Sequence, residues 1–383
     1  MTLSKRQPIW DIFCNVIDNF GDIGVCWRLA RQLVSEHGVR VRLWVNELGA
    51  FRHICPEIEP CSALQTVAGV EVRRWDADFQ SAQPGDVVVE AFACRLPERF
   101  VEAMAARKTT PAWINLDYLS AEDWVSGCHA LPSPHPQFPL TKYFFFPGFT
   151  PTTGGLIREQ NLATRRDEFR ASPEQQRAFW RRLDQTPPLA GTLIVSVFSY
   201  ENQNLTDLLT LWEQGNAPVC CLLPATRSLP AVEACVGRTL SPGEVVQRGS
   251  LELRTLPFVA QPDYDPLLWL CDINFVRGED SFVRAQWAAR PMVWQIYPQD
   301  DEAHLVKLNA FLDLYCAGRP ETEVALVRKL FLAWNGGRLT REIWADWIEA
   351  LPAHRQHAIE WEKYLGKQED LCGSLVRFCR SKL

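Results

Sequence analysis

Two aspartates, Asp18 and Asp22, lie four residues apart in a glycine-containing loop. The loop follows an apolar strand predicted over residues 10–17 and precedes a helix whose apolar residues recur at helical spacing over residues 25–33. Loops at strand ends carry binding and catalytic residues disproportionately, and paired carboxylates there suit proton transfer. The alternative is that Asp22 only caps the helix. The pattern favours the functional interpretation.

The glycines of this loop, Gly21 and Gly24, allow a ligand to approach the backbone closely. Their spacing differs from the dinucleotide fingerprint, in which one residue separates the first two glycines. An anion would also meet both carboxylates. The loop therefore disfavours a nucleotide-sugar epimerase that depends on a dinucleotide.

A second constellation, Arg-Gly-Glu-Asp-Ser over residues 277–281, stands between a predicted strand at 273–276 and a predicted helix at 281–289. Free N–H groups and a positive dipole end suit a diphosphate at such a helix start, and Arg277 adds a cation. Ordinary capping by Asp280 or Ser281 is the alternative. Glu279 and Asp280 would repel phosphate, so we assign them to hydroxyl groups or to the cap.

Other acidic and histidine motifs carry less information. Two Asp-x-Asp triplets, at residues 76–78 and 263–265, match a metal-binding motif, but neither follows an apolar strand, and both are predicted to be surface loops. His129 and His135 lie near Cys128 at a spacing that fits no zinc site. The sequence predicts no bound metal.

The chain of 383 residues is long enough for two domains, and its 47% apolar and 22% charged residues exclude a disordered chain. With 40 basic and 46 acidic residues the net charge is −6, which argues against a nucleic-acid partner. No apolar run suits a membrane span or a signal peptide. Thirteen cysteines without a C-x-x-C pair indicate reduced thiols and a cytoplasmic protein.

Strands and helices alternate along the chain, and the pattern restarts after a polar, turn-rich stretch that begins at residue 150. The sequence predicts an α/β protein with two Rossmann-like, doubly wound lobes that face each other across a cleft. We expect an N-terminal lobe, a linker or helical segment, a C-terminal lobe, and a helix that packs back on the first lobe. These expectations cover residues 1–155, 156–188, 189–353 and 354–383, respectively.

The stretch after the second constellation resembles the nucleotide-sugar half of GT-B glycosyltransferases. A helix, the turn Arg290-Pro291, an apolar strand and the acidic run Gln299-Asp300-Asp301 follow in the order of that fold. Arg290 stands where the GT-B pattern usually has glycine.

A more specific resemblance covers essentially the whole chain. Residues 10–31, 198–201 (Phe-Ser-Tyr-Glu), 256–258 (Leu-Pro-Phe), 277–281 and 294–298 (Trp-Gln-Ile-Tyr-Pro) are similar to the bacterial protein-arginine rhamnosyltransferases that modify elongation factor P, the EarP family. The resemblance implies a metal-independent, inverting transfer of rhamnose from dTDP-β-L-rhamnose to an arginine guanidinium, which activates the factor. It places the acceptor on the N-terminal lobe and the donor on the C-terminal lobe. We expect a monomer without cofactor.

The resemblance also assigns residues. Asp18 and Asp22 match the essential aspartates, with Asp22 as the base, and Glu279 is the third catalytic candidate. Phe258 and Tyr297 match aromatic residues that bracket thymine. The residues expected at the donor are Asn19, Phe20, Gly21, Tyr200, Phe258, Gln261, Arg277, Gly278, Glu279, Asp280, Ser281 and Tyr297.

Two other functions remain open. One is a GT-B enzyme that acts on a glycan or lipid acceptor, which would require an apolar or basic patch on the first lobe. The other is a GT-B protein that binds elongation factor P without catalysis, which the intact Asp18, Asp22 and Glu279 disfavour.

Overall fold

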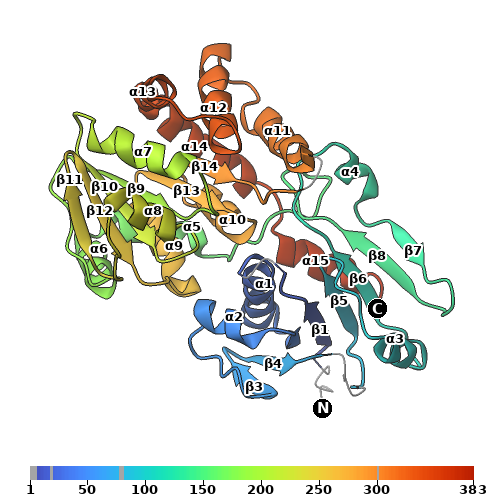
Figure 1. Cartoon of the computed structure of the whole chain (residues 1–383). Coiled ribbons are helices and arrows are strands. Elements are labelled where there is room, and N and C mark those ends of the chain that lie inside the picture. The colour runs from blue at the N-terminus through green and yellow to red at the C-terminus, as the bar shows by residue number, and fades with distance from the viewer. Residues whose placement is uncertain (1–6, 18–19, 77–81, 300–301) are drawn as a thin grey trace. The chain divides into compact units, whose positions relative to one another are not determined.

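The structure is a computed structural model that describes residues 7–17, 20–76, 82–299 and 302–383. These residues form two compact units, Met1–Gln160 with Lys367–Leu383 and Asn161–Gly366. Each unit contains one sheet, blue to green in the first and yellow to orange in the second (Figure 1).

The first unit is built on an eight-stranded sheet in the order β3-β4-β2-β1-β5-β6-β8-β7, with β3 and β7 as antiparallel edge strands. Continuous apolar stretches such as Val-Val-Val in β5 are typical of parallel strands that are covered on both faces. The strands are β1 (Ile9–Cys14), β2 (Arg40–Val45), β3 (Leu64–Val67), β4 (Val70–Arg74), β5 (Val87–Ala91), β6 (Ala112–Leu116), β7 (Pro132–Pro134) and β8 (Thr141–Phe145).

Five helices accompany this sheet in the described part of the first unit: α1 (Gly21–His37), α2 (Leu48–Ile54), α3 (Glu98–Ala105), α4 (Trp124–Cys128) and α15 (Leu371–Arg380). The last of them, α15, lies against α1, where the amide of Gln32 donates to Asp370 at 3.1 Å. The helix α1 is capped at its C-terminus by Gly38, whose φ of 62° is left-handed and suits glycine.

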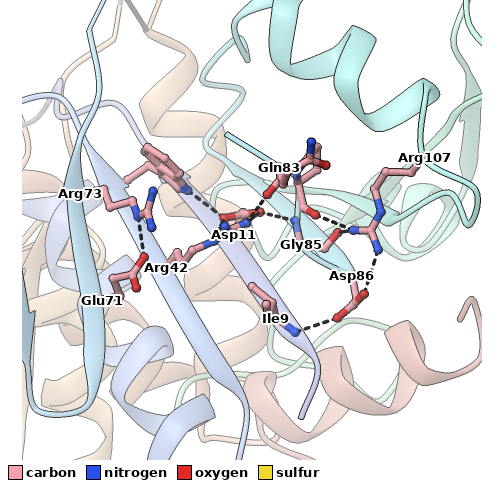
Figure 2. A network of polar contacts seen from close by, with 11 residues as sticks. Ile9, Asp11, Arg42, Glu71, Arg73, Gln83, Gly85, Asp86 and Arg107 are labelled. Carbon is pink, nitrogen blue, oxygen red and sulfur yellow. Dashed lines mark hydrogen bonds and ion pairs between the residues drawn. The ribbon is translucent and has the colours of Figure 1, made fainter. Parts of the chain in front are cut away.

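A buried aspartate joins the central strands of this sheet (Figure 2). Asp11 on β1 is fully buried and accepts two hydrogen bonds from the guanidinium of Arg42 on β2, at 2.7 and 2.6 Å. It also accepts from the indole of Trp44 at 2.8 Å and from the backbone of Gly85 at 2.6 Å. A Cβ at Gly85 would lie 2.4 Å from the Ile9 carbonyl oxygen, so only glycine fits there. The buried charge is thus fully paired, as its burial requires.

The second unit is built on a six-stranded sheet in the order β11-β12-β10-β9-β13-β14, in which only the edge strand β11 is antiparallel. Figure 1 shows these strands in yellow and orange. The strands are β9 (Leu193–Val197), β10 (Val219–Pro224), β11 (Val245–Arg248), β12 (Leu251–Leu256), β13 (Ile273–Arg277) and β14 (Met292–Gln295).

Ten helices belong to the described part of the second unit: α5 (Leu162–Ala171), α6 (Pro173–Arg182), α7 (Asn204–Glu213), α8 (Leu229–Val236), α9 (Gln261–Leu270), α10 (Asp280–Trp287), α11 (Ala303–Tyr315), α12 (Glu321–Trp334), α13 (Arg341–Glu349) and α14 (Leu351–Gly366). Both units alternate strands with helices around parallel sheets, so the predicted α/β class with two Rossmann-like lobes is confirmed.

Two segments differ from the expected division of the chain. Residues 161–188, expected as a linker or helical segment, contain the helices α5 and α6 and belong to the second unit. Arg166 on α5 donates to the Trp287 carbonyl at 2.9 Å and pairs with Glu362 at 3.0 Å. Residues 354–366, expected on the first lobe, form most of α14 in the second unit. There the indole of Trp361 donates to Gln286 at 2.8 Å. Only residues 367–383 return to the first unit.

Among the described residues, no helix is both long and apolar enough to cross a membrane.

All thirteen cysteines are free, and ten of them are buried. Burial raises the pKa of Cys14 and of Cys221 well above the ordinary value, so these thiols are neutral core residues.

Candidate active site

Asp22 lies in the first turn of α1, at the carboxyl end of β1, and is 3% exposed. The helix begins at Gly21 and Phe20 occupies the cap position, so the capping alternative for Asp22 is wrong. Its Oδ2 atom instead accepts from the backbone N–H of Ile17 at 2.9 Å. The positive end of the α1 dipole favours a negative charge at this position. The loop therefore holds the Asp22 carboxylate in a defined orientation.

Two other residues predicted for this loop are described, and two are not. The ring of Phe20 contacts His53 edge-on, with centroids 5.7 Å apart, and Gly21 opens α1. Asp18 and Asn19 lie outside the described residues.

In the second unit, Arg277 ends β13 with its guanidinium between two aromatic rings. Its Cζ atom lies 4.5 Å from the centroid of Phe198 and 4.3 Å from that of Tyr200. Arg277 is 5% exposed, so both cation–π contacts form away from water, where they are strongest. Tyr200 in turn contacts Tyr297 edge-on at 5.4 Å. The structure thus brings Tyr200, Arg277 and Tyr297 together.

The turn between β13 and α10 depends on Gly278 and Ser281. Gly278 has a φ of 62°, and its carbonyl accepts from the indole of Trp294 at 2.8 Å. The hydroxyl of Ser281 accepts from the backbone N–H of Arg277 at 3.1 Å. Glu279 occupies the cap position of α10 but makes no side-chain capping bond, so the simple capping alternative for Asp280 and Ser281 is wrong.

The remaining donor candidates lie at the same sheet edge. The amide of Gln261, the first residue of α9, donates to Asp280 at 3.3 Å. Phe258 follows β12 and is half-buried, whereas Tyr297 follows β14 and is 48% exposed. Carboxyl ends of parallel strands form the ligand edge of such sheets, so this edge can receive a nucleotide diphosphate.

Sequence reasoning missed two supporting side chains. The Cζ atom of Arg277 lies over the ring of Phe198. Phe198 stands two residues before Tyr200, and alternate residues of an extended chain share a face, so this spacing was the available sequence signal. Gln295, at the end of β14, accepts from the Tyr200 backbone N–H at 2.9 Å. No local pattern relates Gln295 to a residue 95 positions away.

The weaker motifs have ordinary structural roles where they are described. Asp263 and Asp265 lie in the first turns of α9 rather than in a surface loop. Asp265 is buried and holds Arg284 through two hydrogen bonds, at 2.8 and 2.6 Å, which corrects the surface prediction. His129 accepts from the Phe146 backbone at 3.1 Å. The described residues contain no cluster of three or more side chains suited to a metal.

Comparisons with known proteins agree with one another. The family model of the Elongation-Factor P (EF-P) rhamnosyltransferase EarP matches residues 10–380. A protein-arginine rhamnosyltransferase of Pseudomonas putida is 50% identical over 380 residues, 98% of this chain and 100% of the relative. A solved structure that addresses EarP-mediated arginine glycosylation of translation elongation factor EF-P is 36% identical to this chain. The match covers 98% of this chain and 100% of that structure's chain, with a TM-score of 0.71.

A more distant solved structure shows the fold alone. MurG of Acinetobacter baumannii is 11% identical, covers 97% of this chain and 98% of its own, and has a TM-score of 0.50. The two parallel-rich sheets thus have the architecture of GT-B glycosyltransferases. Because the family model spans nearly the whole chain and the relative from P. putida matches it over its full length, this chain belongs to the EarP family of Elongation-Factor P rhamnosyltransferases.

Proposed function

We propose that this chain transfers L-rhamnose from dTDP-β-L-rhamnose to a guanidinium nitrogen of one arginine of elongation factor P. The transfer inverts the anomeric carbon and uses no metal ion. Family membership supports the acceptor and the sugar. The structural observation that carries the proposal is the Arg277 guanidinium, held between Phe198 and Tyr200 beside the start of α10.

Asp22 and Asp18 act on the arginine of the acceptor protein. A free guanidinium has a pKa above about 12, whereas a carboxylic acid lies near about 4, so Asp22 does not deprotonate the arginine beforehand. The carboxylates bind the cation and orient one nitrogen. As the C–N bond forms, that nitrogen loses its proton to Asp22, which its hydrogen bond from Ile17 holds in place.

The donor side must stabilise the leaving diphosphate as its C–O bond to the sugar breaks. The charge of Arg277 and the positive end of α10 provide this stabilisation at fixed positions. Ser281 donates or accepts hydrogen bonds at the same turn, and Gly278 lets the backbone approach the phosphate. We assign Glu279 and Asp280 to the hydroxyl groups of rhamnose or deoxyribose.

The nucleoside is assigned to aromatic side chains at the same sheet edge. Phe258 and Tyr297 bracket thymine, and Tyr200 and Gln261 line the adjoining sugar and phosphate. We also assign Phe20 and Gly21, with Asn19, to donor binding. Tyr297 supports this assignment because nearly half of its surface is exposed although it is an aromatic residue.

The decisive experiment incubates the chain with elongation factor P and dTDP-rhamnose and measures the mass of the acceptor protein. We expect a deoxyhexose increment that fragmentation locates on one arginine. Asp22→Asn keeps an oxygen for the Ile17 hydrogen bond but removes the base, so the rate should fall by about 10²- to 10⁴-fold.

Asp346→Asn is the matched control, because Asp346 is exposed on α13 and its replacement should leave the rate unchanged. Near-normal turnover by folded Asp22→Asn would overturn the role of Asp22. A wild-type chain that adds no sugar to elongation factor P would overturn the proposed function.

A further inference from the structure

The turn that follows β5 is strained. Phe92 and Ala93 have positive φ angles of 55° and 53°, a conformation that residues with a Cβ rarely adopt. The turn is held on both sides: the Phe92 N–H donates to the Leu116 carbonyl at 2.7 Å, and the Cys94 thiol donates to the Phe13 carbonyl at 3.1 Å. Backbone strain of this kind concentrates at functional sites, so this turn is a candidate for positioning a functional side chain.

The strained turn supports an aromatic surface. The ring of Phe92 stacks on that of Tyr118, with centroids 4.7 Å apart and planes 25° apart. Phe92 is 6% exposed, whereas Tyr118 is 39% exposed, so Phe92 is the inner ring. Asp117 accepts from the Tyr118 backbone N–H at 2.8 Å and from the Asn115 amide at 3.1 Å. Both the ring and the backbone of Tyr118 are therefore held.

The loops around Tyr118 are acidic. Among the described residues of segments 15–23, 92–97 and 117–124, four side chains are carboxylates and one is a cation. These charged residues are Asp22, Asp117, Glu122, Asp123 and Arg95. The charge of this edge therefore complements a cationic partner.

The sheet places the loops that lead to Tyr118 and to Asp22 at one edge. β1, β5 and β6 are parallel neighbours, so the residues that follow them share one edge. At a spacing of ~4.8 Å per strand, the loops after β1 and β6 are about 10 Å apart. A long side chain that lies over Tyr118 can direct its end toward Asp22. Guanidinium groups stack well on aromatic faces.

We propose that the exposed face of Tyr118, backed by Phe92, is the platform for the arginine-bearing segment of the acceptor protein. The arginine side chain crosses the ring toward Asp22. This inference rests on the proposed function, and it makes Tyr118 a determinant of acceptor binding that takes no part in donor binding.

The test compares the kinetics of Tyr118→Ala, Tyr118→Phe and Tyr364→Ala with elongation factor P and dTDP-rhamnose as substrates. Tyr364 is a matched control, since it is 38% exposed and stacks on Trp361 with planes 24° apart in the second unit. We expect Tyr118→Ala to raise the acceptor KM by about tenfold, with the donor KM unchanged. Tyr118→Phe, which keeps the ring, and Tyr364→Ala should stay within about twofold of wild type.

Each outcome decides the inference. If the wild type is active and Tyr118→Ala has an unchanged acceptor KM, the proposed role of Tyr118 in acceptor binding is wrong and the proposed function still holds. An equal defect in Tyr118→Phe assigns the effect to the hydroxyl group and also overturns the platform. A wild type that transfers no rhamnose overturns the proposed function and this inference together. If the alanine variant does not fold, Tyr118→Gln replaces it with the same expectations.

Discussion

The hydroxyl of Ser281 accepts a hydrogen bond from the backbone N–H of Arg277 at 3.1 Å and donates one to the carbonyl of the same residue. A side chain in the first turn of α10 thus holds the last residue of β13. The guanidinium, whose Cζ atom lies over the rings of Phe198 and Tyr200, is held in place by these contacts without a ligand. Such preorganisation is what stabilisation of a leaving diphosphate requires.

Arg277→Lys should weaken donor binding although it keeps the charge. Lysine has no planar group to lie over the two rings, and it cannot form a bidentate contact with phosphate. We expect the KM for dTDP-rhamnose to rise about tenfold and the acceptor KM to stay constant. Isothermal titration with dTDP checks the binding, and Arg182→Lys, an exposed arginine on α6, is the control. Equal dTDP affinity in Arg277→Lys and wild type would contradict the prediction.

Gln295→Leu should affect both stability and donor binding. The Tyr200 N–H is buried and would lose its acceptor, which costs about 1–3 kcal/mol. The loop that carries Tyr200 would then shift, and the donor KM should rise more than the acceptor KM. Thermal unfolding and the two KM values measure these effects.

Gln247→Leu is the control for Gln295, because Gln247 is exposed and its side-chain amide donates to the nearby Gly249 carbonyl. It should change neither stability nor kinetics. A lower unfolding temperature with unchanged donor KM would show that Gln295 supports the fold without positioning Tyr200.

The ion pair between Asp265 and Arg284 should stabilise the second unit strongly. The side chains are 7% and 1% exposed, so Asp265→Leu removes one partner of a buried ion pair and should cost about 3–5 kcal/mol. The double change Asp265→Leu with Arg284→Met removes both charges and should cost much less. Urea denaturation of both variants measures the difference.

The exposed pair of Arg377 and Glu369 provides the comparison, since its side chains are 72% and 43% exposed. Glu369→Gln should cost less than about 1 kcal/mol. Equal destabilisation by the single and double changes at Asp265 and Arg284 would contradict the expectation that removing one partner costs more than removing both.

Stability should fall in mild acid because of His354. Burial, followed by the charge of Arg319, lowers the pKa of His354 from 6.5 to about 4. Its ring lies 4.7 Å from that of Trp347, and its Nδ1 atom is 3.1 Å from the Arg319 guanidinium. The unfolded chain binds the proton first, so the stability that the neutral ring contributes is complete above pH 6.5 and is lost as the pH falls toward 4.

The measurement for His354 is the unfolding temperature between pH 4 and 7.5. His354→Asn keeps an acceptor near Arg319 but cannot be protonated, so its unfolding temperature should depend less on pH over this range. The pKa of His357 is lowered to about 4 as well, and this residue should retain part of the slope in the variant. Identical slopes in both proteins would exclude His354 as a source.

The main strands were predictable because burial on both faces leaves a local trace. β10 is a continuous apolar run, β5 begins with three consecutive valines, and both strands are fully buried. The antiparallel edge strands β3 and β11 alternate exposed and half-buried residues over four positions, too short and too polar for a clear signal. They pair with β4 and β12, the strands that follow them in the chain.

The amino-acid sequence by itself identified the candidate site residues that follow two strands, because Asp22 and the run from Arg277 to Ser281 are local motifs in glycine-containing turns. Only the tertiary structure decided that Phe198 and Tyr200 enclose Arg277, and that Tyr118 stacks on Phe92. It also paired Asp265 with Arg284 inside the second unit. Periodicity reports how a residue is buried, whereas these contacts join different elements, and their geometry depends on how the strands and helices pack.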